Sequence, residues 1–322
     1  MKKHEYKPSY VWPNPAFPFR VYYESSNMRI FIIENIQHNW EWLKVYSPKF
    51  KSTDYFFVYC GWFHSEFFAK EAEQIFDVLK LNRDNFFFMF NEELEQKSFE
   101  EKGFKGEIIN QNAWLDENIV MKPLVDIKKE YDAIYVGRFS GFKRHHLAQN
   151  VNDLALVAGN NHGNAIAAGI PSHKYRNSCP LTPDEVCEKI NESYCGLILS
   201  AEEGACFASS EYLLCGIPVV STKSKGGRAV WYNKYNSIIC EDDPQEIASA
   251  VEFFKANPRN PKKIRDGYIA KSCVYRQRFI LKLAELLEMH GEYHVDADAY
   301  FKENFIHKMR KSYKPDFENI FN

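Results

Sequence analysis

Residues 199–220 read LSAEEGACFASSEYLLCGIPVV, and this stretch decides the fold that we expect. It continues a short apolar run at residues 195–199, turns at a glycine, and carries a helical pattern over 207–215 that Gly216 ends. Residues 218–221 then open another apolar strand. A buried strand, a loop, a helix and a second buried strand form the repeating unit of a parallel sheet covered by helices.

The loop in this stretch has the chemistry of a binding site. Ligands of an open parallel sheet bind beyond the carboxyl ends of its strands, which is where residues 200–206 lie. The backbone N–H groups and the positive end of the helix that starts near Phe207 suit a phosphate. Glu203 and Glu211 repel phosphate but accept hydrogen bonds from hydroxyls. A ligand with phosphates and vicinal hydroxyls, such as a nucleotide sugar, satisfies both kinds of group.

The spacing of these acids resembles that of the retaining glycosyltransferases with the GT-B fold, in particular glycosyltransferase family 4. That family has a Glu, seven residues, a second Glu and then a Gly-x-Pro-Val-Val segment, and Glu203, Glu211 and residues 216–220 stand at those places. The resemblance implies an α/β protein with two Rossmann-like domains whose parallel sheets face a central cleft. It also implies that Glu203 contacts the donor sugar and Glu211 the ribose hydroxyls.

A second segment, residues 135–146 (YVGRFSGFKRHH), is similar to the same family. Arg offers a planar fork for phosphate oxygens, and Lys offers a mobile point charge. In the family a Gly-Arg pair and a Lys a few residues later neutralise the donor diphosphate; these roles fall on Arg138 and Lys143, with Arg144 as an alternative. The resemblance thus implies a donor site made of Gly137, Arg138, Lys143, Glu203, Gly204, Ala205, Cys206, Phe207 and Glu211.

Around that site the sequence shows weaker similarities to the family and two residues that differ from it. Residues 224–228 (SKGGR) resemble the family's Gly-Gly loop near the donor. Residues 110–116 resemble the segment that ends its N-terminal domain, although an Ala replaces the usual Gly. Cys206 stands where the family has a Gly and Tyr212 where it has an Ala, so we expect a tighter pocket.

The acceptor side departs further from the family. The N-terminal half is short, and no Gly-Gly loop follows its first strand. Many relatives place a His near the reacting carbon. His64, at a strand end, is the first candidate for this catalytic role and His38 the second, while an ordinary hydrogen-bonded His explains either residue.

Strands and helices alternate on both sides of a polar connection, so we predict two domains. Residues 1–125 form a reduced N-terminal acceptor domain, residues 126–296 form the donor domain, and a C-terminal helix within 297–322 packs back on the first domain. The first domain begins with an irregular Pro-rich arm, and its expected strands are 28–33, 54–60, 86–90 and 106–110. For the second half we expect strands 131–136 and 154–158, a helix from Pro183 capped by Thr182, and helices 144–151, 244–256, 264–290 and 297–310.

Composition excludes several classes of function. A net charge of −2 and a pI near 6.6 disfavour binding to nucleic acid. Aromatic residues make up 16% of the chain and crowd its first hundred residues, where core packing explains them better than a sugar site.

The eight cysteines lack any C-x-x-C pair, which favours reduced thiols and a cytoplasmic location. A basic stretch at residues 307–314 leaves peripheral membrane contact open beside a solvated helix end.

Two patterns mimic metal sites. Asp296-Ala297-Asp298 has the Asp-x-Asp form that chelates metal in the other main glycosyltransferase fold, but here it lies between helices and is expected to cap one. His290 and His294 have helical spacing, but Gly291 interrupts the helix between them. We therefore expect no protein-bound metal and no cofactor.

The resemblance implies a glycosyltransferase, and the lack of a metal-site pattern leads us to expect one that is metal-independent. It would move a sugar from a UDP-, GDP- or other nucleotide sugar to a glycan, lipid-linked or other acceptor with retention, in bacterial-type surface polysaccharide or glycoconjugate synthesis. A nucleotide-sugar epimerase or hydrolase of the same fold and a non-catalytic sugar-binding module are the alternatives. A nicotinamide dehydrogenase is disfavoured because no G-x-G-x-x-G follows a strand. The base, the sugar, the linkage and the oligomeric state stay open.

Overall fold

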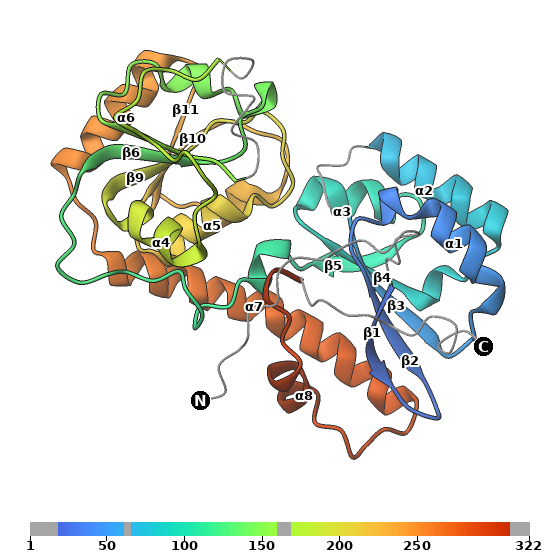
Figure 1. Cartoon of the computed structure of the whole chain (residues 1–322). Helices are drawn as coiled ribbons and strands as arrows, with labels where there is room; N and C mark the ends of the chain where they lie inside the picture. The colour runs from blue at the N-terminus through green and yellow to red at the C-terminus, as the bar shows by residue number, and fades with distance from the viewer. Residues whose placement is uncertain (1–18, 61–65, 160–168, 310–322) are drawn as a thin grey trace. The chain divides into compact units, whose positions relative to one another are not determined.

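The computed structural model describes residues 19–60, 66–159 and 169–309. The chain divides into two compact units, each with its own sheet (Figure 1). Unit 1 contains the described residues up to Trp114 and from Val274 onward, and unit 2 contains those from Leu115 to Cys273.

Unit 2 is built on a parallel sheet of six strands in the order β11-β10-β9-β6-β7-β8. From β6 the chain adds β7 and β8 on one side, then returns to add β9, β10 and β11 on the other. The order therefore reverses between β6 and β9, and a ligand crevice is expected beyond the carboxyl ends of these two strands. The strands are β6 (Tyr131–Val136), β7 (Leu154–Val157), β8 (Tyr175–Arg176), β9 (Ser193–Ile198), β10 (Val219–Thr222) and β11 (Ser237–Cys240).

Helices cover both faces of this sheet (Figure 1). On one face α4 (Pro183–Asn191) and α5 (Phe207–Leu214) lie together, joined by the contact of Cys187 with Cys215. On the other face α6 (Pro244–Ala256) buries its apolar residues against β6, β9, β10 and β11. The predicted cap of α4 is confirmed, because Thr182 and Glu185 form a reciprocal capping box.

Unit 1 has a five-stranded sheet in the order β1-β2-β3-β4-β5. Strands β2 to β5 are parallel, while β1 is antiparallel to β2 and lies at the edge. The irregular arm expected before residue 28 is therefore wrong for residues 19–24, which form β1; a tight turn with Ser25 N–H donating to Met28 O (3.0 Å) returns the chain into β2. The strands are β1 (Phe19–Glu24), β2 (Arg29–Ile33), β3 (Asp54–Tyr59), β4 (Phe86–Phe90) and β5 (Lys105–Ile108).

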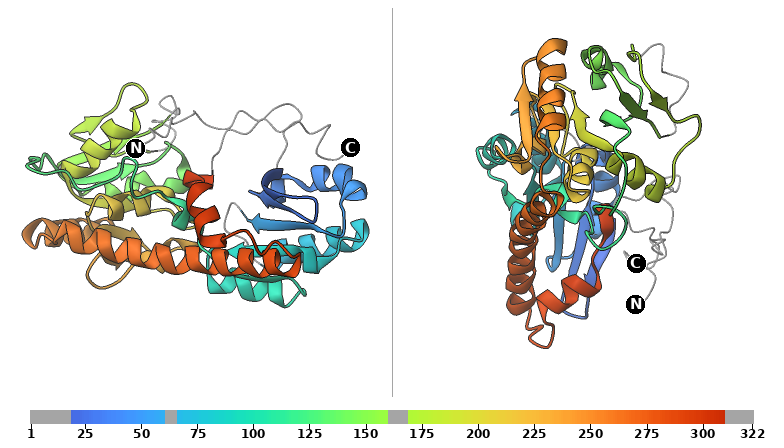
Figure 2. Two further views of the ribbon diagram at one scale, coloured as in Figure 1. Left: turned by 90° about the horizontal axis from the view of Figure 1, so that it is seen from below. Right: turned by 90° about the vertical axis from the view of Figure 1, so that its left-hand side faces the viewer.

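The aromatic residues of unit 1 fill its core, as expected from composition. One face of the sheet packs Phe31, Phe56 and Phe88 under α1 (Trp40–Tyr46), α2 (Glu66–Leu79) and α3 (Glu93–Glu100). The opposite face lies against the part of α7 (Pro261–Met289) from Val274 on and against α8 (Ala297–Glu303), as Figures 1 and 2 show. There Phe279 meets the rings of Tyr22, Phe57 and Trp114 at 4.6–5.4 Å.

Two expected helices are shorter than the sequence pattern. The segment 144–151 is not an α-helix: it contains the 3-10 turn η6 (His145–Ala148), and another 3-10 turn, η5 (Gly141–Lys143), precedes it. Between them Arg144 has φ 51°, and this left-handed residue breaks the hydrogen-bond ladder of a helix. Helix α8 ends at Glu303 instead of 310, and only the 3-10 turn η9 (His307–Met309) follows in the described chain.

Candidate functional site

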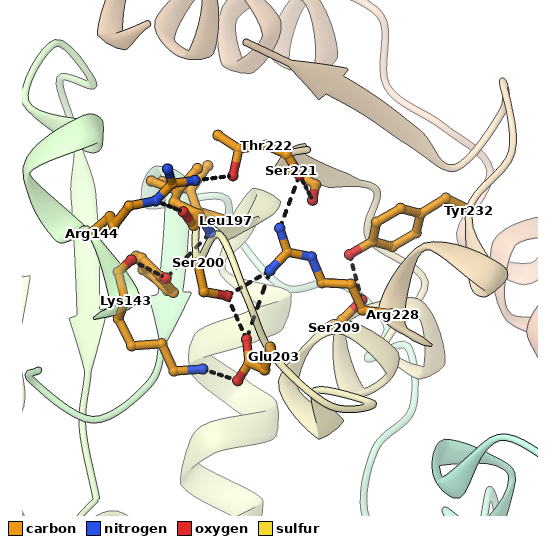
Figure 3. A network of polar contacts seen from close by, with 12 residues as sticks. Lys143, Arg144, Leu197, Ser200, Glu203, Ser209, Ser221, Thr222, Arg228 and Tyr232 are labelled. Atoms are coloured by element: carbon orange, nitrogen blue, oxygen red, sulfur yellow. Dashed lines mark hydrogen bonds and ion pairs between the residues drawn. The ribbon is translucent and has the colours of Figure 1, made fainter. Parts of the chain in front are cut away.

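Lys143 and Glu203 meet at the point where the strand order of unit 2 reverses. Lys143 follows β6 and Glu203 follows β9, so each residue lies beyond the carboxyl end of one of the two central strands. Their Nζ and Oε1 atoms form an ion pair, and each residue is only 7% exposed (Figure 3). The loop after residue 199 and the Gly-Arg-Lys segment, which are far apart in the sequence, are thus parts of one buried cluster.

Arg228 is a third member of this cluster. It belongs to the 3-10 turn η8 (Gly227–Trp231) and is 1% exposed. Its Nη1 donates to Ser200 Oγ (2.6 Å) and lies 3.8 Å from Glu203 Oε2, and its Nη2 donates to Thr222 O (2.9 Å). Ser200 Oγ in turn donates to Glu203 Oε2 (2.6 Å). The sequence pattern marked residues 224–228 as a Gly-Gly loop but gave this arginine no role of its own.

The charges of the cluster do not balance. Burial by itself would raise the pKa of Glu203, but Lys143, Ser200 and Arg228 together hold the pKa of this carboxyl below its usual value. Glu203 is therefore a carboxylate at neutral pH. Lys143, Arg228 and Glu203, called here the switch-point cluster, thus hold two cations and one anion away from water. Such a surplus of positive charge suits an anionic ligand.

The Gly-Gly loop brings the chain that follows β10 close to Glu203. Glu203 N–H donates to Lys225 O (3.1 Å), and Lys225 N–H donates to Ala201 O (2.9 Å). Gly226 has φ +108°, and a Cβ there would lie 1.6 Å from Glu203 O. Only glycine allows this close approach of the two backbones.

The two other basic residues of the segment after β6 have different surroundings. The Arg144 guanidinium donates to Leu199 O (2.6 Å) and Thr222 Oγ1 (2.9 Å) and pairs with Asp242 (2.6 Å), so it braces three loops. Arg138 is exposed, and its guanidinium lies 4.9 Å from the centre of the Phe142 ring, with Lys143 Nζ at 5.2 Å from the same ring. The geometry therefore places Lys143 rather than Arg144 beside Glu203.

The rest of the expected donor site follows in the chain. Gly204 and Ala205 are buried, and α5 begins at Phe207 after Cys206, whose φ of 55° lies in the left-handed region. Glu211 lies one turn further along α5 and is 6% exposed. Gly137 follows β6, and its N–H donates to Val157 O (2.8 Å).

Tyr212 does not narrow this loop, contrary to our expectation. Its ring packs onto Gly196 of β9, where a Cβ would lie 2.1 Å from the ring. Its hydroxyl accepts a hydrogen bond from Val136 N–H at the end of β6 (2.7 Å). The large side chain thus points into the space between α5 and the sheet.

The remaining candidates fall into two groups. His64 lies outside the described residues, and so does the side chain of His38. Asp296 caps α8 by accepting from the N–H groups of Asp298 and Ala299 (2.9 and 3.0 Å), as predicted. Within residues 19–60, 66–159 and 169–309 no three His, Cys, Asp or Glu side chains are grouped to hold a metal, and no helix there is long and apolar enough to cross a membrane.

Comparison with known proteins gives matches in structure only. No family model and no curated protein sequence matches this chain. HepE from Anabaena in complex with UDP superposes with a TM-score of 0.54 at 15% identity, over 79% of this chain and 78% of HepE. Sucrose-phosphate synthase from Thermosynechococcus elongatus gives 0.53 at 14%, over 82% and 73% of the two chains. TarM of S. aureus gives 0.56 at 14%, over 80% and 54%.

These neighbours are GT-B glycosyltransferases. The chain has the GT-B fold. The fold class expected from the sequence is therefore confirmed: an α/β chain with two Rossmann-like sheets, both parallel except for the edge strand β1 of unit 1. In the terms of that fold, the switch-point cluster lies at the carboxyl edge of the sheet in unit 2.

Proposed function

We propose that this chain transfers a sugar from a nucleotide diphosphate sugar to an acceptor hydroxyl with retention of configuration. The observation that carries the proposal is the switch-point cluster: a buried carboxylate with two cations, beyond β6 and β9 and just before α5. A donor of this class has a diphosphate for the cations and hydroxyls for the carboxylate. The GT-B fold of the UDP-bound neighbour HepE supports this donor class.

Each residue then has a role that its position supports. Lys143, Arg138 and the N-terminus of α5 stabilise the charge that develops on the diphosphate as it leaves, a preorganised electrostatic contribution. These groups make a metal ion unnecessary for that step. Glu203 binds hydroxyls of the donor sugar, and Glu211 binds those of the ribose.

Retention is proposed to occur by attack on the face from which the diphosphate leaves. Both oxygens of Glu203 are engaged, one by Lys143 and the other by Ser200. A carboxylate whose oxygens are already paired, and whose pKa is lowered, is a weak nucleophile. We therefore give Glu203 the role of a hydrogen-bond acceptor for hydroxyls. The acceptor hydroxyl therefore takes the place of an enzyme nucleophile in this proposal.

The acceptor is assigned to residues 1–125 and the donor to residues 126–296, with His64 as the acceptor-side candidate. TarM, whose fold this chain shares, has been crystallised with fondaparinux, GlcNAc-glycerol and UDP. This complex supports a glycan acceptor for the chain. A lipid-linked acceptor and a place in the cytoplasmic synthesis of surface polysaccharide or glycoconjugates are proposed from the resemblance in sequence alone.

Thermal stabilisation by a panel of UDP-, GDP- and other nucleotide sugars tests the donor, because ligands that bind only the folded state raise Tm. Glu203→Gln should weaken binding of the preferred sugar donor about 10- to 100-fold, as expected for the loss of a charge-assisted hydrogen bond of about 1.5 to 3 kcal/mol. Free UDP should bind at least as tightly, since Lys143 loses its carboxylate partner. Glu202→Gln, an exposed neighbour, is the matched control.

Product analysis with and without acceptor then identifies the reaction. Transfer requires the acceptor, whereas an epimerase or hydrolase changes the nucleotide sugar without one. If no nucleotide or nucleotide sugar raises Tm, the proposed function is wrong. Binding without any chemical change, with a cellular role that survives Lys143→Ala, would identify a non-catalytic sugar-binding module instead.

A further inference from the structure

The switch-point cluster gives one carboxylate two cationic partners of different kinds. Glu203 Oε1 pairs with Lys143, while Oε2 accepts from Ser200 Oγ, which is held by Arg228. Each carboxylate oxygen therefore has its own supporting cation. A single cation is enough to keep a buried carboxylate ionised when its hydrogen bonds are complete, so the second needs an explanation.

The two cations differ in how firmly they are held. Arg228 is held by two hydrogen bonds of its guanidinium, to Ser200 Oγ and Thr222 O, and its backbone directly follows the glycines that approach Glu203. Lys143 is held through its main chain, where its carbonyl accepts from the Tyr135 hydroxyl (2.6 Å). At the end of its four-carbon side chain, Nζ pairs with Glu203 and lies 5.2 Å from the centre of the Phe142 ring, and no side-chain fork anchors it as the guanidinium anchors Arg228. Lys143 is thus the cation that is able to turn away.

We propose that Arg228 is a positioning residue, which keeps Glu203 ionised and in place when Lys143 turns from it to the diphosphate of the donor. This inference rests on the proposed function for the identity of the anion. The arrangement separates two tasks that one lysine cannot perform at once: binding the leaving group and compensating the buried carboxylate. Arg228 acts through Ser200 and Glu203 and does not itself touch the donor.

Removal of Arg228 should therefore matter most once Lys143 has left. Glu203 would then retain one neutral hydrogen bond from Ser200 in a buried place, and burial would raise the pKa of its carboxyl. The other titratable groups that face it are Tyr135 on β6 and Cys206 before α5. Burial raises the pKa of both, to about 12 for Cys206, so neither carries charge near pH 7. A protonated Glu203 accepts hydrogen bonds from sugar hydroxyls poorly.

A test without ligand uses Lys143→Met to imitate the departure of the lysine. The carboxyl ¹³C shift of Glu203, assigned with Glu203→Gln, reports whether the group is ionised at pH 7. It should be ionised in Lys143→Met and protonated in Lys143→Met/Arg228→Met. If the double variant does not fold, Arg228→Gln in the same background keeps a donor for Ser200, removes the charge, and should give the same change. The same protonation state with and without Arg228 would overturn the proposal.

A second test follows protons during binding of UDP. Calorimetry at pH 7 in two buffers of different ionisation enthalpy gives the protons taken up per UDP. We expect almost none for the wild type and about one for Arg228→Met, because Glu203 takes up a proton as Lys143 leaves. Arg228→Lys should restore the wild-type value. Arg265→Met, which removes an arginine bound to Met121 O and Leu214 O, is the matched control and should show no uptake.

The two tests fail in different ways. A wild type that binds no nucleotide diphosphate rejects the proposed function, while the carboxyl shifts still decide whether Arg228 keeps Glu203 ionised. UDP binding by both forms with equal proton uptake leaves the proposed function standing and rejects the role of Arg228. An effect of Arg228→Met on Tm alone, with unchanged uptake and carboxyl shifts, assigns this residue a structural role only and also rejects the proposal.

Discussion

Replacing Gly226 by alanine perturbs the closest backbone approach in the candidate site. The new Cβ would lie 1.6 Å from Glu203 O and 2.8 Å from Glu203 C, at a residue whose φ is +108°. A residue with a side chain in this backbone region costs about 1 to 3 kcal/mol. Relief of the contact requires the loops to part, with loss of the Glu203–Lys225 and Lys225–Ala201 backbone bonds, each of which contributes about 0.5 to 1.5 kcal/mol.

We therefore expect Gly226→Ala to lower the free energy of unfolding by about 2 to 6 kcal/mol, a large part of the 5 to 15 kcal/mol typical of a folded protein. Urea denaturation at pH 7 measures this loss. Gly267→Ala is the matched control, because Gly267 is exposed on α7 with no atom within 4 Å of its Cβ position. That change should instead stabilise the protein by about 0.5 to 1 kcal/mol. Equal stabilities of Gly226→Ala and wild type would refute the reasoning.

Two further substitutions test the cores of the units. Both ring nitrogens of buried His145 lack partners in the described residues, and burial, Lys143 and His146 lower its pKa to about 4. In the unfolded state His145 binds a proton near pH 6.5, whereas in the folded state it stays neutral down to about pH 4. The free energy of unfolding of the wild type should therefore fall, relative to that of His145→Phe, by up to about 3 kcal/mol between pH 6.5 and pH 4. Denaturation at each pH measures this difference. Asp54→Ala removes the buried carboxylate that the Arg29 guanidinium binds at 2.7 Å and should cost about 3 to 5 kcal/mol, whereas Asp77→Ala at the surface should cost below about 1 kcal/mol. Equal costs of the two aspartate changes, or parallel pH curves for His145→Phe and wild type, would contradict these expectations.

What the sequence predicted well is local along the chain. The strand, loop, helix and strand around residues 199–220 were located within a few residues, because apolar runs, a capping residue and a helix-ending glycine act over a few positions. The meeting of Lys143 with Glu203 was implied only by resemblance, since sixty residues separate them along the chain. The reversal of strand order between β6 and β9 is the physical reason that they meet.

What the sequence did not predict depends on distant partners. Strand β1 pairs with β2 at the edge of the sheet. Its sequence has apolar residues like any strand, but nothing in it indicates which strand it pairs with. The left-handed Arg144 is set by guanidinium contacts to Leu199, Thr222 and Asp242, far along the chain. Arg228 follows two glycines like an exposed loop residue, yet its partners Ser200 and Thr222 bury it.

Cys206 and Tyr212, the two residues that depart from the family's pattern at α5, have opposite effects on the stability of this helix. Cys206 takes a left-handed conformation where the family has glycine, which costs about 1 to 2 kcal/mol. Tyr212, where the family has alanine, buries its ring completely against Gly196, and burial of a large apolar side chain contributes about 1.5 to 3 kcal/mol. Its hydroxyl also binds Val136 N–H at the end of β6. We infer that the packing of Tyr212 anchors α5 strongly enough to offset the strained residue at its start, and so the loop that carries Glu203 keeps its shape without the glycine.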